Sequence, residues 1–455
     1  MALTERLGRF VHDTAFEGIP SRAVQTAKMG VTDCVGVMLA GSQEEAGRLV
    51  AEYARASGQG PGCTVVGSTA RAPAALAALA NGTAAHALDY DDVNWSLIGH
   101  PSVVLVPTVL AFCEERDGSG RAAMEAYAVG FEVLARLGRA AQPVHSSMGG
   151  WHATGTLGAF GATAAAAKLL GLTVDQIRVG FGLTASMASG ICHNFGTMTK
   201  PLHAGHAAHT GIMAARLAQL GVTARTDTFD DPRGFFGVYS RDLSVDLAGA
   251  LQGLGNPFEL EASGLLIKPY PCGVAAHPAV DGALDLARAH GVAADDVVRI
   301  DVGVTRYTFQ KLSYALPETG LQGKFSMPYI VARTLIDGRL SLDAFTDAGV
   351  REPRIRRLAE QVFMAVDPAI EREWRGGDRP CRLTVALRTG ETHSLIVKYS
   401  RGSPGRPLAP AELKDKFEDC AARVLHEKAI AAVWDTLQRL EECSSIRPLL
   451  HMLEA

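Results

Sequence analysis

The spacing of the hydrophobic residues changes twice along this chain, and this change constrains the fold more than any other feature. From residue 3 to about 264, apolar residues recur in Ala- and Leu-rich runs of helical length that close at glycine-containing turns. Around residues 298–304, apolar residues instead alternate with polar or small ones, as in a half-buried strand. Helical runs resume after about residue 402. The sequence therefore predicts a helical body, a mixed segment and a helical tail.

The first part of the chain holds a series of helical patterns. They cover residues 20–40, 72–88, 102–116, 121–138, 153–170, 174–189 and 205–219. Gly171 and Gly221 follow two of these runs, where a helix C-cap favours glycine. Aromatic residues make up only 6% of the chain while Ala and Gly are abundant, and small residues let helices approach closely. We therefore expect a large, tightly packed, all-helical domain.

The segment 265–401 is predicted to form a smaller α+β domain. Helical patterns at 277–290 and 327–337 accompany the strand, and alternating residues at 383–387 and 395–399 flank a turn, which indicates a hairpin. A Gly- and Pro-rich break at 402–407 precedes two further helical patterns at 410–427 and 429–440. The simplest arrangement is a mainly α fold, in which residues 1–264 and 402–455 form the helical domain and residues 265–401 form the lid.

Composition narrows the class of protein. A chain of 455 residues exceeds the size at which a single core stops growing, which favours two domains. The net charge is -4 and there is no run of Lys or Arg, so nucleic acid is not an expected partner. The 8 cysteines are scattered without a CxxC pair, which indicates a reducing compartment.

The start of the chain shows no signal peptide, and the longest apolar run, 103–112, is too short to cross a bilayer. We expect a cytoplasmic protein that does not bind membranes.

Residues 86–102 concentrate ionisable side chains between two apolar helical patterns. This segment contains His86 and His100 together with the carboxylates Asp89, Asp91 and Asp92. Such a cluster in a largely hydrophobic chain indicates tuned proton transfer or carboxylate binding. The same character returns at residues 149–156, 195–209, 267–278 and 323–329. Together these segments predict an enzyme.

These motifs resemble those of the MmgE/PrpD family. The resemblance rests on HALDYDD with GHPS (86–102), GWHATGTLGAFGA (150–162), GTMTKPLHAG (196–205), KPYPC (268–272) and KFSMPY (324–329), which match in order and spacing over essentially the whole chain. It implies a helical larger domain, a smaller α+β lid and an active site between them. It also implies catalysis on small polycarboxylates without metal or organic cofactor, generally by a homodimer.

The resemblance also implies which residues act. The catalytic candidates are Asp89, His100, His152 and Lys268, and the substrate-binding candidates are Lys200 and Tyr314. Apart from the resemblance, we also count His203 among the substrate-binding candidates. We expect Lys268 where the chain crosses between the domains and Tyr314 on the lid, both facing the residues of the helical body. The sequence departs from the pattern of the family's cis-aconitate decarboxylases at two places. Val93 stands where a threonine is expected, and residues 272–273 stand where a further site histidine is expected.

Each candidate has a structural alternative. His100 precedes a proline at a helix start and could simply cap or pack, His152 could be an ordinary loop histidine, and Lys200 and Lys268 could be solvated. The three carboxylates could serve as helix-terminal charges, and Tyr314 could pack within the lid. For His100, His152 and Lys200 we favour a role in the active site over these alternatives. A histidine among acids is suited to proton transfer, and Lys200 lies between apolar neighbours, as in a lined pocket.

Two further patterns have structural explanations. His203, His206 and His209 recur every third residue, but the spacing differs from that of zinc motifs, so we expect packing or a place at the rim of the site, and no metal. The glycines at 155, 158 and 161 lack the preceding strand of a nucleotide-binding loop, so they are interpreted as helix-packing residues.

Three function classes remain open at this stage. The first is a lyase that dehydrates a hydroxy-polycarboxylate, as 2-methylcitrate dehydratase does, or decarboxylates an unsaturated one. The second is a two-base isomerase similar to iminodisuccinate epimerase. The relatively short length of this chain for the family and the segment 194–201 resemble that enzyme. The third is a non-catalytic relative that binds a carboxylate, against which the retained His and Lys residues argue.

Overall fold

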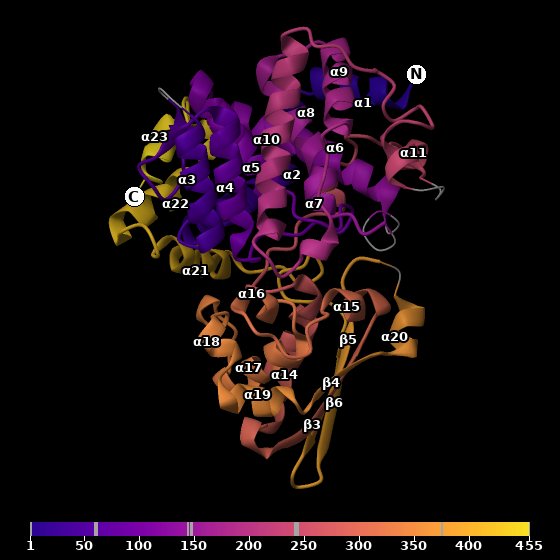
Figure 1. Ribbon diagram of the computed structural model, residues 1–455, viewed down its shortest axis with the longest axis vertical. Coiled ribbons are helices and arrows are strands. Elements are labelled where there is room, and N and C mark those ends of the chain that lie inside the picture. The colour runs from indigo at the N-terminus through magenta and orange to yellow at the C-terminus, as the bar shows by residue number, and fades with distance from the viewer. Residues whose placement is uncertain are drawn as a thin grey trace. The chain divides into compact units, whose positions relative to one another are not determined.

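The computed structural model describes residues 2–58, 62–142, 145, 149–240, 245–374 and 376–454. Contacts between residues divide the chain into two compact units, one of Met1–Leu265 with Ala409–Ala455 and the other of Leu266–Leu408. The first unit is built almost entirely of helices, and the second combines helices with a sheet (Figure 1). The expected mainly α fold class with a smaller α+β part is confirmed. That the second unit acts as a lid stays a prediction.

Helices of the first unit follow the periodic runs of the sequence. From the N-terminus they are α1 (Leu3–Asp13), α2 (Ser21–Gly41), α3 (Glu45–Ser57), α4 (Ala74–Ala87), α5 (Ser102–Arg116), α6 (Gly120–Ala141), α7 (Ala153–Thr156), α8 (Gly158–Leu170), α9 (Val174–Ala185), α10 (Thr199–Gln219), α11 (Phe235–Tyr239), α12 (Leu247–Ala250) and α13 (Glu259–Ala262). Helix α10 begins at Thr199 rather than at residue 205. A short ribbon of β1 (Cys63–Thr64) and β2 (Arg71–Ala72), which the sequence analysis did not anticipate, interrupts the helices.

The core of the first unit depends on close approach between helices. Helix α10 packs along α4 and α8, and α8 packs on α6. A Cβ on Gly205 would lie 2.1 Å from the Leu79 carbonyl oxygen, and one on Gly161 would lie 2.9 Å from the Gly130 carbonyl oxygen. Any larger residue at these positions would force the helices apart. Gly158, against Val104 of α5, and Gly161 thus serve helix packing as expected, whereas Gly155 approaches the carbonyl oxygen of Ser189, which lies outside any helix.

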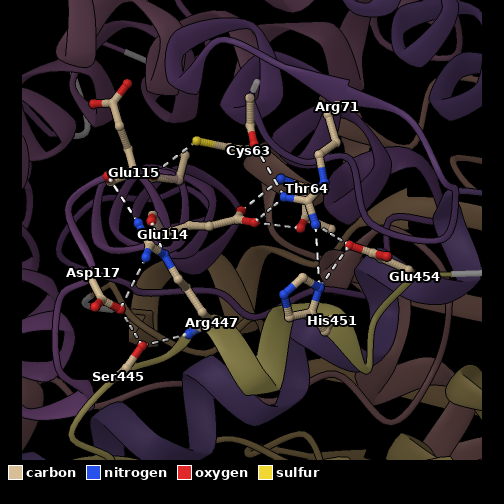
Figure 2. Close-up of polar contacts among 12 residues, drawn as sticks. Cys63, Thr64, Arg71, Glu114, Glu115, Asp117, Ser445, Arg447, His451 and Glu454 are labelled. Carbon is tan, nitrogen blue, oxygen red and sulfur yellow. Dashed lines mark hydrogen bonds and ion pairs between the residues drawn. The ribbon is translucent and has the colours of Figure 1, made fainter. Parts of the chain in front are cut away.

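The C-terminal helices α21 (Pro410–Ala421), α22 (Glu427–Gln438) and α23 (Arg447–His451) belong to the same unit. Figure 2 shows how α23 is attached. Arg71 binds Glu114 at 2.7 Å and also pairs with Glu454, and the Arg447 Nε atom donates to the Glu114 carbonyl oxygen at 2.9 Å. The Ser445 hydroxyl donates to Asp117 at 2.6 Å. These bonds fix the tail against α5 and the β1–β2 ribbon.

The second unit is built on a four-stranded sheet in the order β4-β3-β5-β6. Its strands are β3 (Val297–Val304), β4 (Val362–Val366), β5 (Cys381–Leu387) and β6 (Thr392–Val397), and its helices are α14 (His277–His290), α15 (Arg306–Lys311), α16 (Gly320–Gly323), α17 (Met327–Asp337), α18 (Asp347–Val350), α19 (Pro353–Ala359) and α20 (Pro368–Glu373). The expected strand and hairpin are present, and Gly390 adopts the positive φ of +90° that the hairpin turn requires.

Strand β4 is the element of this sheet that the sequence analysis did not anticipate. It pairs in parallel with β3, and α17 and α19 lie in the crossover between them. Its side chains alternate in burial, but all of its residues are apolar, including Phe363, which is 45% exposed. A five-residue strand whose apolar residues are not confined to one face leaves no clear periodic signal.

Among the described residues, none of the helices combines the length and the apolar character that crossing a bilayer requires.

Candidate active site

The acidic segment between α4 and α5 places one carboxylate between two imidazoles. Asp91 Oδ1 lies 2.9 Å from His86 Nδ1, and Asp91 Oδ2 lies 2.7 Å from His100 Nδ1. Carboxylate and carbonyl oxygens can only accept hydrogen bonds, so each ring carries its proton on Nδ1. His86 donates to Asp91, and His100 donates to the Asp92 carbonyl oxygen at 2.9 Å beside Asp91. A ring that is neutral with its proton on Nδ1 presents the lone pair of its Nε2 atom, which is the form of histidine that acts as a base.

A buried ion pair lies beside these rings. Lys200, in the first turn of α10, places its Nζ atom 2.7 Å from Asp89 Oδ1, and both side chains are only 5% exposed. The backbone of Asp89 has a φ of 51°, in the left-handed region that non-glycine residues rarely adopt. The Phe195 ring lies 5.4 Å from the Lys200 Nζ atom. A lysine held in such surroundings is suited to receive a substrate carboxylate.

His152 lies immediately before α7 and faces His203 of α10. The Nδ1 atoms of the two rings are 3.0 Å apart, while the His152 Nε2 atom is buried without a hydrogen-bond partner among the described residues. Burial, reinforced by His86 and Lys200, lowers the pKa of His152 well below its ordinary value. Burial likewise lowers the pKa of His86 to about 3 and that of His203 to about 4. These rings are therefore neutral at pH 7 and able to accept a proton.

The three imidazoles of His86, His100 and His152 converge. The ring centroid of His86 lies 4.5 Å from that of His100 and 5.7 Å from that of His152, and the other two are 6.3 Å apart. The Nε2 atom of His86, like that of His152, has no hydrogen-bond partner within the described ranges. Buried, unpaired nitrogens of this kind are costly unless a ligand or a function uses them.

The same convergence makes a cation site geometrically possible. One nitrogen from each of His86, His100 and His152 lies within 4.8 Å of the others, and a second group of His86, Asp89, Asp91 and His100 meets the same limit. Three imidazoles form a donor set that zinc accepts. The expectation that no metal is used stays a prediction. His206 and His209 are not part of either group, and their rings stack at 6.5 Å.

Buried and partly buried hydrogen bonds hold the loop that carries these groups. The backbone of Asn94 pairs with that of Gly99, and the Asn94 side chain donates to the Gly264 carbonyl oxygen at 2.8 Å. The His100 backbone N–H donates to the Thr154 hydroxyl at 3.1 Å, which connects the loop to α7. Burial raises the pKa of Asp92 well above its ordinary value, and the Ser102 hydroxyl binds this carboxyl group.

Five of the residues expected from the sequence lie together in the first unit: Asp89, His100, His152, Lys200 and His203. Lys268 and Tyr314 belong to the second unit, where Ile267 N donates to Gly402 O at 3.0 Å and Tyr314 N donates to Phe325 O at 3.4 Å. Their roles, like those of the other five, stay predictions.

The structure adds two residues that the site list from the sequence omits, His86 and Asp91. Both lie in the acidic motif, so the density of ionisable residues was a signal for them. The spacing of five residues between them carries no periodic meaning, and only the turn after α4 brings the two side chains to 2.9 Å. Val93, where a hydroxyl was expected, is buried.

Comparison with known proteins identifies the family. The model of the MmgE/PrpD N-terminal domain matches residues 5–248, and that of the MmgE/PrpD C-terminal domain matches residues 270–441. Human cis-aconitate decarboxylase is 27% identical over 469 residues, covering 99% of this chain and 94% of the human protein. Cis-aconitate decarboxylase of Aspergillus terreus is 25% identical over 480 residues, covering 99% of this chain and 96% of the fungal protein. The resemblance found in the sequence motifs is confirmed, and this chain belongs to the MmgE/PrpD family.

Proposed function

We propose that this protein is a lyase that acts on a small di- or tricarboxylate, by dehydration or decarboxylation, through proton transfer beside a carboxylate and without a cofactor. The observation that carries the proposal is the convergence of three imidazole rings, those of His86, His100 and His152, near the Lys200–Asp89 ion pair. The relatives named cis-aconitate decarboxylase support the lyase class.

Decarboxylation needs an acid and a positive charge that stabilises the intermediate, and dehydration needs a base as well. In decarboxylation, the bond to the departing carboxylate breaks, CO2 leaves, and its electron pair is delocalised onto a conjugated carboxylate before an acid protonates carbon. In dehydration, a base removes the proton beside a carboxylate and an acid protonates the departing hydroxyl. His100 and His152 supply the acid and the base, and Lys200 stabilises the enolate-like charge. Asp89 orients Lys200 through their 2.7 Å contact.

An epimerase is the second candidate, and one observation favours it. His100 and His152 are oriented by separate partners, Asp91 and His203, which is the arrangement that two independent bases require. The buried apolar side chain of Val93 and the glycine at position 273, both of which depart from the decarboxylase pattern, also leave room for this alternative.

Incubating the protein with a panel of di- and tricarboxylates in deuterated water, followed by proton NMR, distinguishes these reactions. Loss of CO2 or elimination of water supports the lyase. Incorporation of deuterium with inversion and no other change supports the epimerase instead. His152→Ala serves as the control for contaminating activity, because it removes a proposed acid or base. Absence of any exchange or conversion by the folded wild-type protein across the panel contradicts both proposals.

The proposal includes assembly and compartment. We expect a homodimer, as the family resemblance implies, and analytical ultracentrifugation at micromolar concentration tests it; a sedimenting monomer of 48.1 kDa would contradict it. The 8 free cysteines support a reducing compartment, and we place the protein in the cytoplasm. Imaging of the tagged full chain in its native cell checks this placement.

A further inference from the structure

Lys416 connects the C-terminal helix α21 to the acidic loop of the candidate active site. Its Nζ atom donates to the Tyr90 carbonyl oxygen at 2.7 Å and lies 2.5 Å from Asp33 Oδ1 on α2. The same ammonium lies 4.0 Å from the centre of the Tyr90 ring. Lys416 and Asp33 are both buried. One cation therefore holds the backbone and the ring of Tyr90 at once, and an ion pair anchors that cation to α2.

Tyr90 lies between two residues whose orientation the site depends on. Asp89 precedes it, in a left-handed conformation with a φ of 51°, and binds Lys200 at 2.7 Å. Asp91 follows it and binds both His86 and His100. The Tyr90 carbonyl belongs to the peptide group that joins Tyr90 to Asp91, so holding it constrains the backbone that leads into Asp91. Holding the Tyr90 ring at the same time restrains the residue that directly follows Asp89. A strained backbone persists only where its surroundings hold it.

We propose that Lys416 is a positioning residue of the active site, which holds the Tyr90 carbonyl so that Asp89 faces Lys200 and Asp91 faces His86 and His100. The kinetic part of this inference rests on the proposed function. The structural part does not, because it concerns the conformation of the loop alone.

The alternative is that Lys416 only anchors the C-terminal segment to the helical body. The chain offers a matched case in Lys28 of α2, whose Nζ atom lies 2.8 Å from Glu441 and donates to the Gln438 carbonyl oxygen at 3.0 Å. Both lysines join the C-terminal segment to α2 through an ion pair, and each also donates to one carbonyl oxygen, that of Gln438 for Lys28 and that of Tyr90 for Lys416. Of the two lysines, only Lys416 contacts the acidic loop. Removing the Lys28–Glu441 pair therefore tests the effect of anchoring alone, and removing the Lys416–Asp33 pair tests anchoring together with positioning.

The experiment compares the double variant Lys416→Met/Asp33→Asn with the control Lys28→Met/Glu441→Gln in the full chain. Each double variant removes both charges of its pair, which avoids leaving an isolated charge in the interior. Lys416→Arg is added as the conservative variant, because guanidinium retains the charge and the donors.

Circular dichroism and thermal melting establish that each variant is folded at the assay temperature. Hydrogen exchange of the peptide spanning residues 86–97, followed by mass spectrometry, then reports on the loop without any need for substrate.

We expect Lys416→Met/Asp33→Asn to lower kcat about 100-fold, since a small misplacement of acid and base has an effect of that order. Its loop should exchange faster than that of the wild type, Lys416→Arg should recover part of kcat, and the control should stay within about twofold of the wild type in kcat and exchange. Equal kcat and exchange in the two double variants would overturn the inference. If the wild type converts no substrate but the loop of the Lys416 variant alone exchanges faster, the proposed function fails while the positioning role stands.

Discussion

The Nδ1 atom of His152 lies 3.0 Å from the Nδ1 atom of His203. One hydrogen fits between the two nitrogens, so one ring donates and the other accepts, and the two tautomers are coupled. If His203 donates, the second nitrogen of neutral His152 carries its proton and serves as an acid; if His203 accepts, the Nε2 atom of His152 is a base. His203 thus acts on the chemistry of the site through His152.

Replacing His203 should test this coupling. We expect His203→Phe to lower kcat about 10- to 100-fold, the range found when an orienting partner of a functional histidine is removed. His203→Asn should lose less, because its amide can either donate to or accept from His152. The measurement is kcat and kcat/KM against pH for both variants. Identical losses in the two would contradict a role in setting the tautomer and leave His203 as a packing residue.

Removing either proposed acid–base residue should nearly abolish turnover. We expect His100→Ala and His152→Ala each to lower kcat by about two to four orders of magnitude, the usual effect of losing a general acid or base. Steady-state kinetics measure the loss and circular dichroism checks the fold. His206→Ala is the matched control, because its partly buried ring stacks on His209, outside the converging group. Turnover near that of the wild type in either variant would remove that histidine from the mechanism.

Acidification should destabilise the fold through its buried neutral histidines. Burial lowers the pKa of His145 from 6.5 to about 4. Between these two values the unfolded chain binds more protons than the folded one, so the free energy of unfolding rises with pH across this window and is lost as the pH falls. One such group contributes a slope of about 1.4 kcal/mol per pH unit.

We therefore expect His145→Gln to reduce that slope by about 1.4 kcal/mol per pH unit. Urea unfolding of both proteins at several values between pH 4.5 and pH 6, on the order of half a unit apart, measures it. Above about pH 7 the two stability curves should run parallel, because the histidine is neutral in both states there. Parallel curves throughout the acidic range would show that His145 is charged when buried.

Activity should not depend on a bound metal. The proposed proton transfer uses His100 and His152, and Lys200 supplies the positive charge that a metal would otherwise provide. We expect turnover to survive exhaustive dialysis against EDTA and elemental analysis to find no stoichiometric metal. Zinc near one per chain, with activity lost on its removal, would instead assign the ion to the cluster of His86, His100 and His152.

The sequence by itself determined the order and type of nearly all the large elements. The long apolar run predicted α5 at Ser102–Arg116, and helical periodicity predicted α14 at His277–His290. A helix that is buried all round is apolar on every face, whereas a helix with one buried face repeats its apolar residues with the helical period. The alternation at 298–304 predicted β3 for the same reason. The five motifs identified the family, which the two domain models confirm.

Tertiary structure alone decided the elements and contacts that have no local signal. Strand β4 is held by its parallel pairing to β3, and the β1–β2 ribbon by packing on α3, α4 and α5, rather than by a pattern of their own. The sequence placed His86, Asp91 and His100 in one motif but could not show that a single carboxylate binds both rings. In the sequence, nothing distinguishes Lys416 from any other helical lysine. Only the fold places it against Tyr90, 326 positions away in the chain. The local period of apolar residues shows which face of an element is buried. Contacts between distant segments depend on how the elements pack together, and the spacing of residues along the sequence does not encode this packing.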